Sequence, residues 1–94
     1  MAKIPSSIRI KRNIKYDIVY QDLIKDDPTC LGLCDPNTRM IHLKTNQSDK
    51  DFIKTTIHEL FHCFEFDYKI KIPHKEIGKL ENAVYQFLVL NKLI

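Results

Sequence analysis

Two short segments near the start of the chain alternate apolar and polar residues, with the period of two that β-strands show. They are residues 7–11 (SIRIK) and 14–21 (IKYDIVYQ), and the short break between them is long enough for a tight turn. Residues 30–45 (CLGLCDPNTRMIHLKT) indicate a second hairpin around an Asp-Pro-Asn turn sequence, and residues 40–44 alternate between the two faces of its second strand. These patterns predict two β-hairpins that together form a small antiparallel sheet.

The second half of the chain changes to a helical pattern. Ser48 is followed by two aspartates within three residues, which is typical of a helix start: serine caps free N–H groups, and acidic residues favour the first turn. We expect this helix to extend from about residue 49 to residue 67. Pro73 suits the first turn of a final helix that continues to about Asn91. Strands followed by two helices predict an α+β fold, as a single domain over residues 1–94.

Composition and charge place the chain among ordinary globular proteins. Its 94 residues are 44% hydrophobic and 29% charged, which is enough for a small core. A net charge of +3 is too weak to predict a nucleic-acid partner. No apolar run reaches the about 18 residues of a membrane span, and the N-terminus does not resemble a signal peptide. We therefore expect a cytoplasmic monomer without nucleic-acid or membrane partners.

The three cysteines do not form an obvious pair. Cys30 and Cys34 fall within one expected strand, where four residues span about 13 Å, too far for a disulfide. Cys63 is expected in the middle of the first helix. Because no matching set of metal ligands accompanies Cys30 and Cys34, we interpret all three as reduced, half-buried thiols.

The stretch HELFH, at residues 58–62, carries the candidate chemistry. At about 100° per residue, His58 and His62 share one face of the expected helix, beside its apolar stripe. Two imidazoles one turn apart can hold a single Zn²⁺ ion. Glu59 is offset by about 60° to 100°, so it can take a proton from a zinc-bound water without binding the metal. The alternative is two helix histidines that only pack against their neighbours.

A catalytic zinc needs a third protein ligand. Glu81 lies on the core-facing side of the final helix with Ile77 and Leu88, and a buried carboxylate requires a cation. We therefore predict Glu81 as the third ligand. His74 is the alternative, since it lies two turns earlier on the same face and can turn to the metal if the helix begins later than Pro73. The residue that does not bind is expected to stay nearby and support the site.

With Glu81 nineteen residues after His62, the motif resembles the gluzincin metallopeptidases. More narrowly, it is similar to the minimal phage-type and mobile-element-type gluzincins, distant relatives of the ImmA/IrrE peptidases. Over roughly residues 14–91, the segments GLCDPNTRMIHL, HELFHCFEF and KIPHKEIGKLENAVYQFL carry this similarity. The resemblance implies a small antiparallel sheet, an active-site helix and a short final helix.

The same resemblance implies a zinc site made by His58, His62 and Glu81, with Glu59 as the general base. The chain departs from the family pattern at one position, where Cys63 replaces the usual small residue after the motif. The SprT-like proteases, a neighbouring group, have a third histidine instead of the glutamate. That second resemblance favours His74 as the third ligand.

We therefore expect a zinc metallopeptidase that hydrolyses a peptide or protein substrate. The resemblance to zincins implies that residues 39–44 bind the substrate by edge pairing. We interpret Tyr85 as a core aromatic, with support of the oxyanion as the alternative, and His42 as a surface histidine. A rival function is a zinc-binding regulator, catalytically weak or inactive, that binds a partner protein. A third possibility is a metal-free α+β domain.

Overall fold

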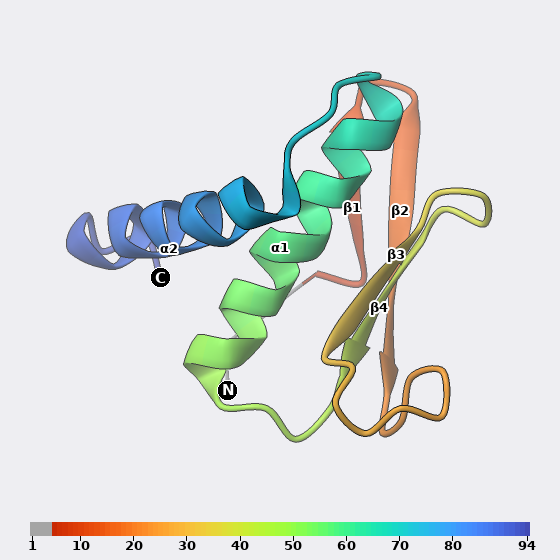
Figure 1. Cartoon of the computed structure of the whole chain (residues 1–94), viewed down its shortest axis with the longest axis horizontal. Helices are drawn as coiled ribbons and strands as arrows, with labels where there is room; N and C mark the ends of the chain where they lie inside the picture. The colour runs from red at the N-terminus through yellow and green to blue at the C-terminus, as the bar shows by residue number, and fades with distance from the viewer. Residues whose placement is uncertain (1–4) are drawn as a thin grey trace.

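The computed structural model describes residues 5–94, which form one four-stranded sheet and two helices (Figure 1). The α+β fold expected from the sequence is confirmed, and both hairpins are present. The strands are β1 (Ser7–Lys11), β2 (Ile14–Gln21), β3 (Gly32–Asp35) and β4 (Met40–Lys44). The helices are α1 (Asp49–Asp67) and α2 (His74–Leu90).

The two hairpins join through a parallel pair of strands. The strand order is β1-β2-β4-β3, with β1 antiparallel to β2 and β3 antiparallel to β4. Strands β2 and β4 are parallel, with Ile18 opposite Ile41. The sheet is therefore mixed rather than wholly antiparallel. Alternation within each hairpin fixes which residues share a face, but it does not fix the direction in which one hairpin meets the other.

The expectation that residues 39–44 form a free sheet edge is wrong. Strand β4 lies between β2 and β3, so its backbone groups are used on both sides. The edge nearest the HELFH stretch is β3, the four-residue strand Gly32–Asp35. The long connection between β2 and β3 carries the chain to the outer position before β4 returns to the middle.

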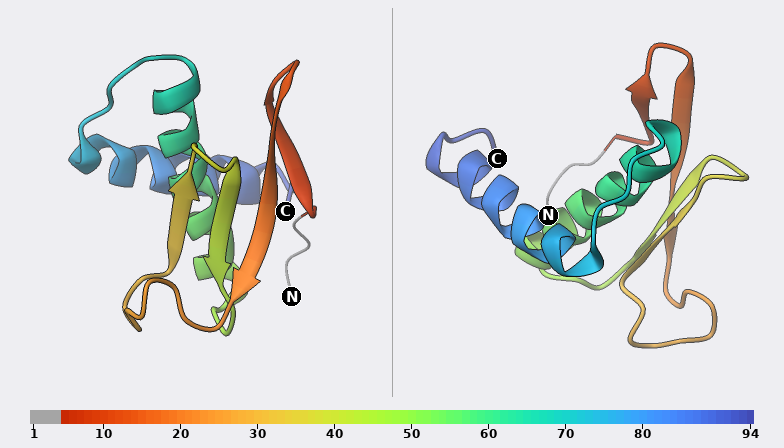
Figure 2. Two further views of the ribbon diagram at one scale, coloured as in Figure 1. Left: turned by 90° about the vertical axis from the view of Figure 1, so that its right-hand side faces the viewer. Right: turned by 45° about the horizontal axis from the view of Figure 1, so that its top comes forward.

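The molecule has three layers, with α1 between the sheet and α2 (Figure 2). Helix α1 packs on one face of the sheet, and the residues that meet there form the core. The largest fully buried side chains of this core cluster are Tyr16, Ile41, Leu43 and Phe52. Cys63 is also fully buried in the cluster. This packing fixes which side of α1 faces the strands.

The helix ends follow the sequence signals closely. The side chain of Ser48 accepts the N–H of Asp51 at 3.1 Å and caps α1, as expected. Helix α2 begins at His74, with Pro73 as its N-cap, one residue later than the sequence suggested. Within residues 5–94, neither helix has the length and apolar character needed to cross a membrane.

Candidate metal centre

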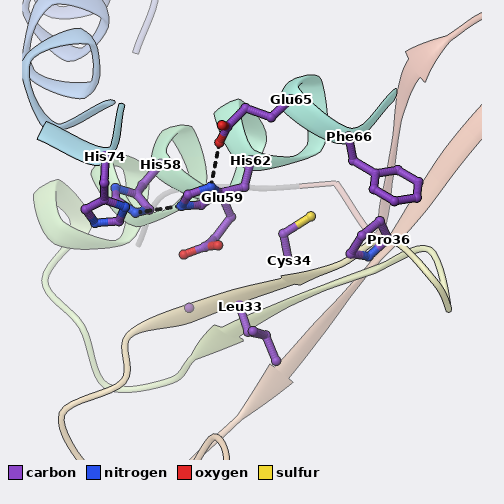
Figure 3. Close-up of a pocket in the computed structure, with 10 residues that line it drawn as sticks. Leu33, Cys34, Pro36, His58, Glu59, His62, Glu65, Phe66 and His74 are labelled. Carbon is purple, nitrogen blue, oxygen red and sulfur yellow. Dashed lines mark hydrogen bonds and ion pairs between the residues drawn. The ribbon is translucent and has the colours of Figure 1, made fainter. Parts of the chain in front are cut away.

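Three histidines converge where α2 begins beside the middle of α1. His58, His62 and His74 each offer a ring nitrogen, and these nitrogens all lie within 4.8 Å of one another. The ring centroids of His58 and His74 are 5.0 Å apart, and those of His62 and His74 are 5.5 Å apart. Figure 3 shows the three rings gathered at one end of a cavity. Three imidazoles in this arrangement are a typical ligand set for Zn²⁺.

Two glutamates fix how the α1 rings point. Nδ1 of His58 lies 2.9 Å from Oε1 of Glu81, and Nδ1 of His62 lies 2.9 Å from Oε1 of Glu65. A carboxylate only accepts, so each Nδ1 must carry the proton of its ring. In a neutral imidazole the other nitrogen, Nε2, is then an unprotonated acceptor. Both rings therefore direct a lone pair inward.

The inward nitrogens face each other closely. The Nε2 atoms of His58 and His62 are 3.2 Å apart. Two lone pairs at that distance repel unless a cation or a proton lies between them. Two ligands of a tetrahedral zinc at about 2.05 Å would themselves be about 3.3 Å apart. The spacing thus fits a shared metal ion, whereas a metal-free site would have to keep one ring protonated.

The geometry does not favour the predicted role of Glu81 as the third metal ligand. Its Oε1 atom meets Nδ1 of His58, the nitrogen on the far side of the ring from the converging Nε2 atoms. Its Oε2 atom lies 3.8 Å from Nζ of Lys54, which supplies the positive charge that a half-buried carboxylate requires. The structure instead places His74, the alternative, beside His58 and His62. Glu81 stays nearby and contacts the His58 ring, which is the position of a group that orients a ligand if a metal binds.

Glu65 is a site residue that sequence reasoning missed. Its Oε1 atom accepts from His62, and its Oε2 atom accepts the backbone N–H of Ile72 at 3.0 Å. The Ile72 bond first, and then His62, hold the pKa of the Glu65 carboxyl below its usual range. One side chain therefore holds the His62 ring and also fixes the segment just before His74. The i,i+3 spacing from His62 to Glu65 is the signal that could have found it.

Glu59 lies between α1 and the edge strand. Its side chain is buried, and the backbone N–H of Cys34 on β3 hydrogen-bonds to it. Burial raises the pKa of the Glu59 carboxyl, while the neighbouring His58 and His62 act in the opposite direction. Figure 3 shows its carboxylate pointing away from the helix, toward β3 and beside the histidine rings. This is where a base that does not bind the metal should lie.

The close approach of β3 to α1 depends on Gly32. A Cβ atom at this position would lie 2.6 Å from Cγ2 of Thr55 and 3.1 Å from Cγ of Glu59. Real Cβ atoms essentially never come within 3.0 Å of another heavy atom, so a side chain here would force the strand outward. Glycine thus lets the edge strand lie directly against the Glu59 side chain.

An open cavity runs along β3 in front of these residues. Its volume is about 620 Å³, and residues of β3, α1 and the start of α2 line it (Figure 3). A second cavity of about 330 Å³ is lined by the segment that leads into β3, by α1 and by Glu81. Gly32, His58 and Glu59 line both cavities. The candidate base is therefore reached from both.

Two other residues singled out from the sequence lie elsewhere. Tyr85 lines neither cavity, and the ammonium group of Lys50 lies 5.9 Å from the centre of its ring. Tyr85 is half-buried and lies outside the core cluster, so its interpretation as a core aromatic is wrong, and it does not join the three histidines either. His42 is on β4 and contacts Oε1 of Gln21 through Nδ1, away from the three converging rings.

Comparison with known proteins identifies no relative of this chain. No protein-family model, no curated protein and no solved structure matches the chain. The resemblance to gluzincins therefore rests on the HELFH motif and its neighbouring segments.

Proposed function

We propose that this protein is a zinc-dependent metallopeptidase whose metal ligands are His58, His62 and His74. One observation carries the proposal: the Nε2 atoms of His58 and His62 face each other at 3.2 Å, while both Nδ1 atoms contact carboxylates. This arrangement calls for a cation between the rings. The position of His74, with its nitrogen within 4.8 Å of the other two, supplies a third donor.

Each residue of the site has a part in the proposed reaction. Zinc, when bound, lowers the pKa of a water molecule toward about 7 and polarises the carbonyl of the scissile bond. Glu59 takes a proton from the attacking water and returns it to the leaving nitrogen. Glu81 and Glu65 keep the His58 and His62 rings in the orientation that binds metal.

The number of available ligands favours an enzyme over a purely structural site. Among residues 5–94, no fourth histidine, cysteine or acidic side chain joins the three histidines. Catalytic zinc sites typically keep one position open, whereas structural sites are closed by four protein ligands. A zinc-binding regulator that captures a partner protein is the second candidate, and an inactive protein with bound metal would indicate it. The proposal also includes a cytoplasmic monomer acting on a peptide or protein.

The deciding experiment compares the parent protein with Glu59→Gln. Both are stripped with a chelator, reloaded with Zn²⁺, and tested on an unfolded protein and a peptide library. We expect one zinc per chain in each, because Glu59 does not bind the metal. Peptide hydrolysis should fall by about 10² or more in the variant, the usual cost of losing a general base.

A matched control is Glu76→Gln, which removes a carboxylate from the exposed side of α2, where Glu76 lies 3.8 Å from Lys79. This variant should retain both zinc and activity. Equal hydrolysis by the parent and Glu59→Gln would remove Glu59 from the mechanism. A parent that binds no zinc would refute the metal site itself, and a zinc-loaded parent without hydrolysis would support the regulator.

A further inference from the structure

Two of the three cysteines meet beneath the candidate metal centre. The Sγ atoms of Cys34, on β3, and Cys63, on α1, are 2.8 Å apart. A disulfide bond is about 2.05 Å long, so the two sulfurs need to approach by less than about 1 Å to bond. Figure 3 shows the Cys34 sulfur directed toward α1. Sequence spacing gave no sign of this pair, because 29 residues separate its members.

The two sulfurs differ in access, and this decides which one reacts first. Cys63 is fully buried in the core cluster. Cys34 is only half-buried and lines the 620 Å³ cavity, so a small molecule can reach it. Cys30 is set apart, since its thiol contacts the carbonyl of Gly32 at 3.3 Å and lines the other cavity.

We infer that Cys34 and Cys63 are an oxidation site, where a hydroperoxide forms a disulfide that ties the edge strand to the motif helix. Hydrogen peroxide transfers one oxygen to the Cys34 thiol, giving a sulfenic acid and one water. The Cys63 sulfur then attacks Sγ of Cys34, forms the S–S bond and releases a second water. Two thiols lose two electrons and two protons, and the peroxide is reduced to two waters. A dithiol reductant reverses the step by exchange.

The cross-link would act on the wall of the cavity. The N–H of Cys34 hydrogen-bonds to Glu59, and Gly32 brings the same strand against α1. The disulfide would hold this part of the cavity wall, β3, against α1. The inference needs no metal at the histidines, and a chelator can be present throughout its test.

The test uses the full chain with Cys30→Ser, so that only Cys34 and Cys63 remain. This substitution is needed because tryptic peptide 26–39 contains both Cys30 and Cys34, while peptide 55–69 contains Cys63. Treatment with hydrogen peroxide should lower the intact mass by about 2 Da and join the two peptides. Oxidation should also raise the unfolding midpoint temperature by on the order of 10 °C, and a dithiol should reverse both changes.

Cys34→Ser is the matched control, because it keeps Cys30 and Cys63. It should show no internal cross-link and no rise in the midpoint. The inference fails if peroxide leaves both thiols of Cys30→Ser open to alkylation. It fails equally if peroxide adds oxygen to Cys34 without a cross-link, or links two chains instead of one. The result does not depend on folding of a Cys63 variant, since every protein in the test keeps the buried sulfur.

Discussion

The orientation of two imidazole rings turns a five-residue motif into a candidate site. A helix places His58 and His62 on one face, but it leaves each ring free to present either nitrogen. The contacts of Nδ1 with Glu81 and Glu65 settle the choice, because a carboxylate can only accept. At the scale of single residues, the two glutamates are therefore as informative as the histidines themselves.

Substitution of the two candidate third ligands gives a residue-scale prediction. His74→Asn should lower zinc affinity by more than about 100-fold, because one of three donors is lost. Glu81→Gln should lower it by roughly 10-fold to 100-fold, the usual cost of losing a group that orients a ligand. His42→Asn, on β4 and away from the site, is the matched control and should bind normally. Zinc titration of the chelator-stripped proteins measures the affinity of all three variants. If Glu81→Gln lowered the affinity more than His74→Asn did, Glu81 would be the ligand.

The contact between β3 and α1 is the element-scale feature that shapes the cavity. A strand of four residues lies at the sheet edge, with Gly32 directly against Thr55 and Glu59. The buried row of α1 includes Glu59, Cys63 and Asp67, so the helix presents polar groups to the sheet where an apolar face would be usual. Those groups are satisfied by partners on the strands: Cys34 for Glu59 and Cys63, and Tyr16 for Asp67.

The two glycines of the chain allow a matched test of this contact. Gly32→Ala should destabilise the fold by roughly 1–3 kcal/mol, because its Cβ meets Cγ2 of Thr55 at 2.6 Å. Adding Thr55→Ser removes that methyl group and should recover part of the loss. Gly78→Ala, inside α2 with nothing within 4 Å of the new Cβ, should stabilise by about 0.5–1 kcal/mol.

Urea unfolding of the parent, these three variants and Thr55→Ser alone measures the differences in free energy. Thr55→Ser alone keeps the hydroxyl that donates to Gln47 at 2.9 Å, so it should cost little. If Gly32→Ala were as stable as the parent, β3 would be able to move outward at no cost. The close approach of the strand to Glu59 would then not be a fixed feature of the site.

At the scale of the whole molecule, the histidines connect the middle layer, α1, with the outer layer formed by α2. His58 and His62 belong to α1, which packs on the sheet, while His74 is the first residue of α2 (Figure 1). Much of the far end of α2 is exposed, including Phe87 and Leu90, so this helix gains limited support from core packing. A metal ion held by both helices would fasten α2 to the rest of the fold.

This arrangement predicts that zinc stabilises the folded protein. Free zinc at about 100 times its dissociation constant should add about 2.7 kcal/mol, since it binds the folded state. For a chain of this size the unfolding midpoint should rise by roughly 10–20 °C. His74→Ala should lose most of the rise, because the α2 donor is gone. Thermal unfolding of the parent and of His74→Ala, each with zinc and with chelator, measures the rise in the midpoint. An equal rise in the two proteins would exclude His74 as a ligand.

Local patterns alone determined much of this protein. Alternation and turn residues predicted both hairpins, and Ser48 marked the start of α1 correctly. The helical period placed His58 and His62 on one face, with Glu59 beside them. These features depend on neighbours within a few residues, so the order of residues is enough to specify them.

Only the tertiary structure decided the remaining features, because each depends on segments distant in the chain. The parallel pairing of β2 with β4 left β3, rather than β4, at an edge of the sheet. The path from α1 to α2 brought His74, rather than Glu81, to the other histidines, with Glu65 fixing that path through Ile72. The same packing set Cys34 against Cys63 across 29 residues. Periodicity orders residues on one element, whereas the relative position of two elements follows from how their side chains fill the space between them.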